Sequence, residues 1–214
     1  MAMDKEQFIR ELVEQHKPRR PLLSPALRTL VWALIVLTGT VILTILVQTI
    51  RPGCCAQLAR YPLLLVEVLT ALLIVPCAAY VCFSGTVPGA RVPRGARITL
   101  WCLSALLLGC LAISCAHTQL SPPSSETGHR HFCCIEVLLY GGLALAGFLV
   151  MARRGYLRFS SRRGALMGLM AGLMPAAIMQ IACMYNPSHA LVFHYAPTAL
   201  LVCAGIVALR FLRR

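Results

Sequence analysis

Residues 30–50 read LVWALIVLTGTVILTILVQTI, a run of 21 positions that contains no charged side chain. An α-helix rises about 1.5 Å per residue, so a run of this length crosses the roughly 30 Å hydrocarbon core of a bilayer. The whole composition agrees, because 58% of the 214 residues are hydrophobic and only 13% are charged. A soluble domain carries about 25% charged residues. The composition therefore argues against a soluble enzyme and predicts a membrane protein.

Five further stretches are long and apolar enough to span a bilayer. Together with residues 30–50, they are residues 62–84, 98–116, 133–152, 164–184 and 193–211. We therefore expect an all-α membrane protein, a bundle of six transmembrane helices within residues 21–214. Residues 1–20 precede this transmembrane domain and form a separate segment.

The basic residues predict how the bundle is oriented. Seventeen of the 20 Lys and Arg residues lie in the amino-terminal tail, in the loops after the second and fourth spans, or at the carboxyl end; the exceptions are Arg51, Arg60 and Arg130. Cytoplasmic loops carry an excess of positive charge, so both termini are expected in the cytoplasm. The net charge of +13 is spread over these segments without aromatic residues arranged to stack on bases, which argues against direct binding of nucleic acid.

The motifs of several enzyme classes are absent from the sequence. It contains no phosphate-binding Gly-rich loop, HExxH, CxxC or GxSxG motif. We therefore expect no catalytic residues and no enzymatic activity. One alternative stays open, a small membrane thiol oxidoreductase or a metal or solute exporter, which would need reactive cysteines or polar residues deep in the bundle.

Thiols and imidazoles gather at the face opposite the basic residues. Such thiols form disulfides in an oxidising compartment, and thiolates together with imidazoles bind zinc, copper or heavier thiophilic ions. A fixed structural disulfide and a sensor or metal site both fit this pattern. The adjacent cysteine pairs match no zinc spacing, so we expect no resident metal or cofactor and leave open only transient heavy-metal binding. The residues at this face are Cys54, Cys55, Cys115, Cys133, Cys134, Cys183, His117, His129, His131, His189 and His194.

Within this set, Cys133 and Cys134 open the fourth span and Cys183 closes the fifth. A disulfide needs Cα atoms about 4.4–6.8 Å apart, so these residues pair only if the outer ends of the two spans touch. Glu136 lies one turn after Cys133, where its carboxylate would tune a thiol or complete a metal site. Glu67, inside the second span, is either functional or near enough to the boundary to reach water.

Small residues repeat along the fifth span, where Gly164, Gly168 and Gly172 follow one another at intervals of four. This spacing lets two helix backbones approach closely in lipid. We expect it to serve packing within the chain rather than homodimerisation, because five other spans are available as partners. The oligomeric state stays open.

The amino-terminal tail has a different character. Phe8, Ile9, Leu12 and Val13 recur at helical spacing and form an apolar stripe on a short charged helix. A helix this short is marginal in water, so it is expected to fold against a partner. Its many acidic residues argue against an anionic lipid surface and favour a groove on a protein.

Several short motifs follow one another along the chain. The tail leads through Lys17-Pro18-Arg19-Arg20, the fourth span ends in Met151-Ala152-Arg153-Arg154-Gly155, and the fifth begins with Arg163-Gly164-Ala165-Leu166. A cysteine opens the fourth span and another closes the fifth. The chain ends in Leu209-Arg210-Phe211-Leu212-Arg213-Arg214. Over nearly its full length, this layout resembles the NrsF-type negative regulators of SigF, a bacterial extracytoplasmic-function sigma factor.

The resemblance implies an anti-sigma factor of the bacterial inner membrane. Such a protein holds an extracytoplasmic-function sigma factor at the cytoplasmic face until stress reaches the periplasmic side. The two family cysteines needed for that response would correspond to Cys133 or Cys134 and to Cys183. The expected signal is redox or heavy-metal stress, and the expected partners are the sigma factor and the lipid bilayer.

Overall fold

The computed structural model describes residues 6, 23–48, 50–87, 89, 91–117, 120, 130–155, 160–183 and 185–212. Six helices in it are long and apolar enough to cross a membrane, and no strand occurs among these residues. The predicted all-helical class and the number of spans are therefore confirmed. The tail residues Phe8, Ile9, Leu12 and Val13 lie outside the described part, so the amphipathic helix stays a prediction.

The helix bounds follow from local capping signals that extend beyond the apolar runs. The first span begins at Pro25, earlier than predicted, because the Ser24 hydroxyl accepts a hydrogen bond from the Leu27 amide and Pro25 suits the first helical position. The last span likewise begins early, at Pro187, where the Asn186 side chain accepts hydrogen bonds from two amides of the first turn. The elements are α2 Pro25–Val47, α3 Cys54–Arg60, α4 Pro62–Ser84, α5 Arg94–Ala116, α6 Cys133–Arg153, α7 Ser161–Ala182, α8 Pro187–His189, η2 Ala190–Tyr195 and α9 Ala196–Phe211.

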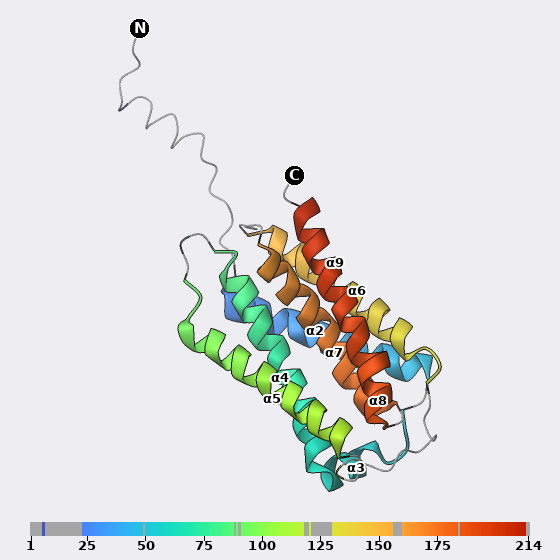
Figure 1. Ribbon diagram of the computed structural model, residues 1–214. Helices are drawn as coiled ribbons and strands as arrows, with labels where there is room; N and C mark the ends of the chain where they lie inside the picture. The colour runs from blue at the N-terminus through green and yellow to red at the C-terminus, as the bar shows by residue number, and fades with distance from the viewer. Residues whose placement is uncertain are drawn as a thin grey trace.

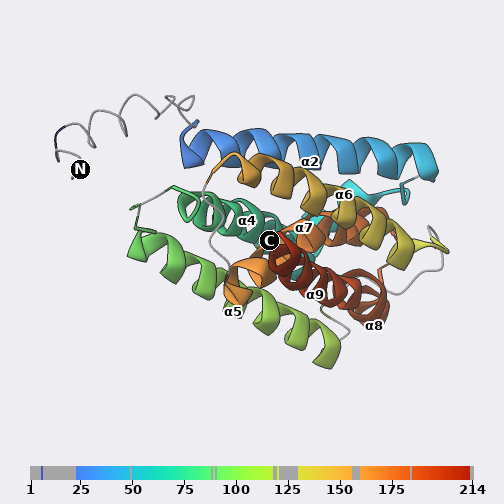
Figure 2. The same ribbon diagram turned by 90° about the horizontal axis from the view of Figure 1, so that it is seen from above.

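Helix α7 is the central helix of the bundle. It contacts α2, α4, α6 and α9, and its apolar face is the most deeply buried of the six spans (Figure 1). The view from above shows α2 and α5 on opposite sides of the bundle with α7 between them (Figure 2). Because α7 lies at the centre of the bundle, a movement at one end of this helix can affect the helices packed around its other end.

The glycines of α7 face α9. A Cβ on Gly164 would lie 2.7 Å from the Cα of Ile206, and a Cβ on Gly172 would lie 3.0 Å from the Cα of Thr198. A Cβ on Gly168 would collide with the carbonyl group of Leu201. Close packing within the chain is thus the role that the structure shows for this repeat, as expected.

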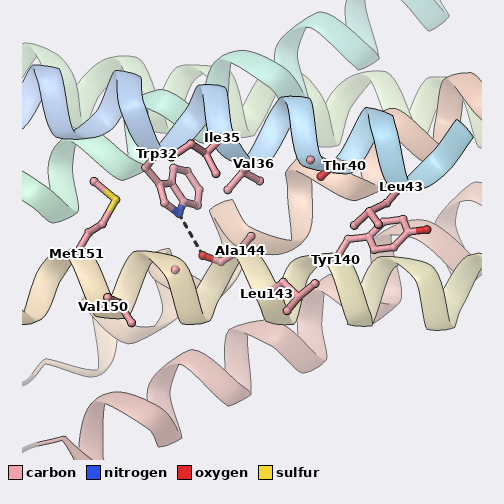
Figure 3. Close-up of a pocket in the computed structure, with 12 residues that line it drawn as sticks. Trp32, Ile35, Val36, Thr40, Leu43, Tyr140, Leu143, Ala144, Val150 and Met151 are labelled. Atoms are coloured by element: carbon pink, nitrogen blue, oxygen red, sulfur yellow. Dashed lines mark hydrogen bonds between the residues drawn. The ribbon is translucent and has the colours of Figure 1, made fainter. Parts of the chain in front are cut away.

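Helix α2 packs less extensively, and polar contacts tie it to α6 at three levels. Near its start, Arg28 donates to the main-chain oxygen of Met151 at 2.6 Å. At mid-height, Trp32 Nε1 donates to the carbonyl of Ala144 at 3.1 Å, beside an apolar groove of about 370 Å³ between the two helices (Figure 3). At the far end, Arg130 donates to main-chain oxygens in the last turn of α2. The two helices are therefore connected from one end of the bundle to the other.

Candidate functional site

Cys133 and Cys183 meet at the end of the bundle where α2 ends. Cys133 is the first residue of α6 and Cys183 directly follows α7, and because these helices pack side by side their sulfur atoms lie 3.2 Å apart. Both side chains are buried, with 1% and 0% of their surface exposed. The condition set for pairing, that the ends of these two spans touch, is therefore met.

Two imidazoles complete this group. The Nε2 atom of His189 lies 3.4 Å from the sulfur of Cys183, and the ring of His194 is fully buried beside it. One donor atom from each of the four residues lies within 4.8 Å of all the others. We refer to Cys133, Cys183, His189 and His194 as the Cys–His cluster.

The local backbone explains why both histidines reach the cluster. His189 ends the short helix α8, which Asn186 caps, and His194 lies in the π-helical segment η2. In a regular α-helix, residues five apart point roughly 140° away from each other. The wider i→i+5 hydrogen bonding of a π-helix brings such residues closer to one face. The segment thus aims both rings at the same point.

Two buried arginines flank the cluster. Arg51, which is 3% exposed, is anchored by its amide to the carbonyl of Ala182, and its charge acts on Cys183. Arg130 pairs with Glu136 at 2.8 Å, and its carbonyl oxygen lies 3.2 Å from the sulfur of Cys133. Glu136 therefore neutralises an arginine rather than joining the cluster, although it does share a face with Cys133 as predicted.

The surroundings favour a thiolate at Cys183. The hydrogen bond with Cys133, aided by the nearby His194, lowers the pKa of Cys183 well below that of an ordinary thiol, although burial acts in the opposite direction. The thiolate is the reactive form toward oxidants and the form that binds metal ions. The pair thus favours one thiolate that is hydrogen-bonded to the neighbouring thiol.

The remaining outer cysteines do not join the cluster. Cys134 is half-buried, and only its neighbour Cys133 contributes a sulfur to the group. The sulfur atoms of Cys54 and Cys55 lie 3.9 Å apart on α3. Cys115 is exposed at the end of α5. Cys133 and Cys134 were both candidates to meet Cys183. In the structure, Cys133 is the one that does.

A second buried polar group lies one turn deeper. Glu67 is fully buried and accepts hydrogen bonds from the Ser114 hydroxyl and from Gln180 Nε2. Tyr195 in turn donates to Gln180 Oε1 at 2.7 Å. Contact with water, one of the two roles left open for Glu67, does not fit this burial. The carboxyl group instead connects α4 with α5 and α7, and Gln180 extends the network to Tyr195 in η2.

The sequence did not identify His189, His194, Arg51 and Arg130 as parts of one site. The histidines were only placed at the same face, and the arginines served only as markers of orientation. The spacing of His189 and His194 would suggest one site only if the π-helical turn were known in advance. Their convergence depends on contacts between four separate segments, which no local pattern encodes.

Chemically, the Cys–His cluster offers two reactions. Two sulfurs 3.2 Å apart are close enough to form a disulfide after a small movement when a two-electron oxidant removes the electrons and protons of the thiols. Thiolate and imidazole donors in one small buried space also suit a thiophilic metal ion. Either event would draw together the ends of α6 and α7.

Comparison with known proteins identifies the family of the chain. Residues 12–214 match the family described as NrsF, negative regulator of sigma F, which confirms the resemblance seen in the sequence. No curated protein and no solved structure gives a significant match. Because the match covers nearly the whole chain, the protein belongs to the NrsF family of negative regulators of sigma F.

Proposed function

We propose that the chain is an anti-sigma factor of the bacterial inner membrane that holds an extracytoplasmic-function sigma factor at the cytoplasmic face. Oxidation or a thiophilic metal at Cys133 and Cys183 would release it. Family membership supports the regulatory role and a sigma factor as partner. The observation that carries the sensing step is the buried contact between Cys133 and Cys183, which joins two helix ends.

The orientation of the bundle is part of this proposal. With both termini in the cytoplasm, the Cys–His cluster faces the periplasm and the start of α2 faces the partner. Residues 1–20, with the apolar stripe of Phe8, Ile9, Leu12 and Val13, would grip the sigma factor. The signal and the response then lie on opposite sides of the membrane.

The contacts of Arg130 provide a route between them. Arg130 lies three residues before Cys133 and pairs with Glu136 on α6. It also donates to the carbonyls of Thr44, in the last turn of α2, and of Gln48, which directly follows α2. A shift of the start of α6 therefore acts directly on the end of α2. Because α2 leads back to the amino-terminal tail, movement of this one helix would change how the tail is presented.

A site of this kind is strong enough to supply the free energy needed to release the sigma factor. To shift a two-state equilibrium from 99:1 to 1:99, a signal must favour the releasing state by about 5.5 kcal/mol. A disulfide contributes about 2–4 kcal/mol, and a structural zinc site contributes about 10 kcal/mol or more. Only the part of this free energy that differs between the holding and the releasing state shifts the equilibrium. A metal-thiolate site that binds the releasing state more tightly is strong enough to supply the whole difference, whereas a disulfide alone would give a partial release.

The burial of the cysteines argues against the alternative of a membrane thiol oxidoreductase. An oxidoreductase must bring its reactive sulfur into contact with a protein or quinone substrate. Cys133 and Cys183 are 1% and 0% exposed, so they admit a small oxidant or an ion more readily than a large substrate. The family is also regulatory rather than enzymatic.

The proposal is tested by transcription from a sigma-dependent promoter in cells. Cys133→Ser and Cys183→Ser should each abolish the increase that follows an oxidant or a heavy metal. Cys134→Ser is the matched control, since it removes the neighbouring thiol, and its response should equal that of the wild type. A normal response in Cys183→Ser would refute the sensing role.

A further inference from the structure

The size of the Cys–His cluster matches a tetrahedral metal site. Zinc binds sulfur at about 2.3 Å and nitrogen at about 2.0–2.1 Å, so neighbouring ligands of a tetrahedral ion lie roughly 3.3–3.8 Å apart. The two sulfurs of the cluster are 3.2 Å apart, and Cys183 lies 3.4 Å from His189 Nε2. The whole set lies within 4.8 Å. An ion would need only small side-chain movements to reach all four donors.

His194 points to a ligand independently of these distances. Its side chain is fully buried, yet neither ring nitrogen has a hydrogen-bond partner of good geometry among the described residues. Buried polar groups without a partner are rare and costly in folded proteins. One ring nitrogen lies within 4.8 Å of the sulfur of Cys183, where a bound ion would satisfy that nitrogen.

The two imidazoles are held in position before any ion binds. The ring of His189 stacks on Phe193 with centroids 4.7 Å apart and meets the ring of His194 edge-on at 5.2 Å. The π-helical turn that aligns the two rings is a local distortion of the kind that clusters at functional sites. Such preorganisation lowers the cost of assembling the site when the ion arrives.

The charge of the two sulfur ligands matches a divalent cation. Two cysteine thiolates carry two negative charges, which a divalent cation neutralises in the buried space. The neighbouring Arg130–Glu136 pair adds no net charge, whereas Arg51, which is buried next to Cys183, adds one positive charge beside the cluster. A mixed sulfur and nitrogen donor set in a tetrahedral arrangement is the usual preference of zinc.

We propose that Cys133, Cys183, His189 and His194 bind one Zn²⁺ ion as a tetrahedral Cys2His2 site. The ion joins the start of α6, the end of α7 and the α8–η2 turn. This inference deepens the proposed function and rests on it only for the biological role of the ion, because metal binding is measurable without the sigma factor. In that role zinc is one of the thiophilic ions whose binding at the two sulfurs favours release of the sigma factor.

The test uses the full chain purified in detergent, reduced and stripped of metal with a chelator. Co²⁺ serves as the spectroscopic probe, and Zn²⁺ is then added to displace it. We expect one Co²⁺ per chain, with the visible d–d absorption of a tetrahedral ion and a thiolate-to-metal charge-transfer band. Zinc should abolish both signals at one equivalent.

Single variants identify the ligands. His189 is only half-buried, so His189→Ala should fold normally and is the decisive variant. Loss of a partner that merely orients a ligand costs 10–100-fold in metal affinity, so loss of a direct ligand should cost more than about 100-fold. His194→Asn, Cys133→Ser and Cys183→Ser should weaken binding similarly. Cys134→Ser and His117→Ala, at the same end of the bundle but outside the cluster, should bind as the wild type does.

The outcomes separate this inference from the proposed function. Absence of Co²⁺ binding, or unchanged affinity in His189→Ala, would overturn the four-ligand site while leaving a disulfide-based sensor intact. Stoichiometric binding that depends on His189 supports the site whatever happens to transcription. A normal transcriptional response in Cys183→Ser would then overturn the sensing role alone.

Discussion

Arg130 and Glu136 form a buried ion pair, Nη2 to Oε2 at 2.8 Å, one helical turn from Cys133. The same guanidinium donates to two main-chain oxygens at the end of α2, at Thr44 and Gln48. The Thr44 carbonyl also accepts a hydrogen bond from the Gln48 amide, so Arg130 adds a second donor there, and its positive charge suits the carboxyl end of a helix. Arg130 therefore satisfies the end of one helix while its neighbour Cys133 begins another, which connects the candidate sensor to α2.

Glu136→Gln should destabilise the protein by about 3 kcal/mol, because removing one partner leaves the other charge buried and unpaired. The expected result is a lower midpoint in denaturant-induced unfolding of the detergent-solubilised protein. Arg130→Gln combined with Glu136→Gln should recover part of this loss. If the stability lost in the double variant equals the sum of the losses in the two single variants, the pair contributes no coupling energy, which would contradict the expectation.

Arg28→Lys tests whether α2 transmits the signal. Arg28 donates from two different nitrogens to Thr86 and to the main-chain oxygen of Met151, and its guanidinium stacks over Phe83 at 4.5 Å. A lysine cannot reproduce this planar two-pronged contact. We expect the Cys133–Cys183 disulfide to form as in the wild type, while release of the sigma factor is reduced. The exposed Arg94→Lys is the control, and full release from Arg28→Lys would mean that α2 is not the route.

Gly168→Ala should disrupt the contact between α7 and α9. The new methyl group would meet the carbonyl of Leu201 and would lie 2.5 Å from the Cα of Val202, and neither backbone atom moves easily. Overpacking of this kind costs about 1–3 kcal/mol. Gly142→Ala on α6 is the matched control, since its Cβ meets nothing within 4 Å and should be neutral or stabilising by up to about 1 kcal/mol. Equal unfolding midpoints for the two variants would contradict the close packing described here.

Glu67→Ala should cost more stability than Glu67→Gln. The alanine leaves Ser114 and Gln180 without their shared acceptor, and each buried group that loses its partner costs about 1–3 kcal/mol. The glutamine keeps one acceptor oxygen and fills the same volume. Unfolding experiments on both variants, with Ser114→Ala for comparison, measure the difference. Equal stability of the alanine and glutamine variants would show that hydrogen bonding at Glu67 is unimportant.

The spans were predictable from the sequence because lipid imposes a local rule. Each helix must present about 20 apolar residues to the bilayer, and that length is visible in one continuous run. The second span was placed at residues 62–84, as the structure has it, because Pro62 opens it and Ser84 closes it. Errors of a few residues arose where capping by Ser24 or Asn186 adds polar turns to a helix.

The Cys–His cluster was only partly predictable, because its members meet through packing. The sequence placed Cys133, Cys183 and both histidines at one face. A zinc motif, however, is recognised by the spacing of ligands that are close together along the chain, and these donors are not. In the fold, α6, α7 and the α8–η2 turn bring the donors together across separate segments. The arginines showed the same limit, since Arg130 was counted as a loop charge and is in fact a buried partner of three acceptors.

The central claim is that closure of the Cys133–Cys183 contact releases the sigma factor. The most direct measurement is co-purification of the sigma factor with a variant in which these two are the only cysteines, before and after treatment with a two-electron oxidant. We predict that the reduced protein retains the sigma factor, that the oxidised protein retains less of it in proportion to the disulfide formed, and that added reductant restores binding. Equal retention in the oxidised and reduced states, with the disulfide verified by mass spectrometry, would contradict the account.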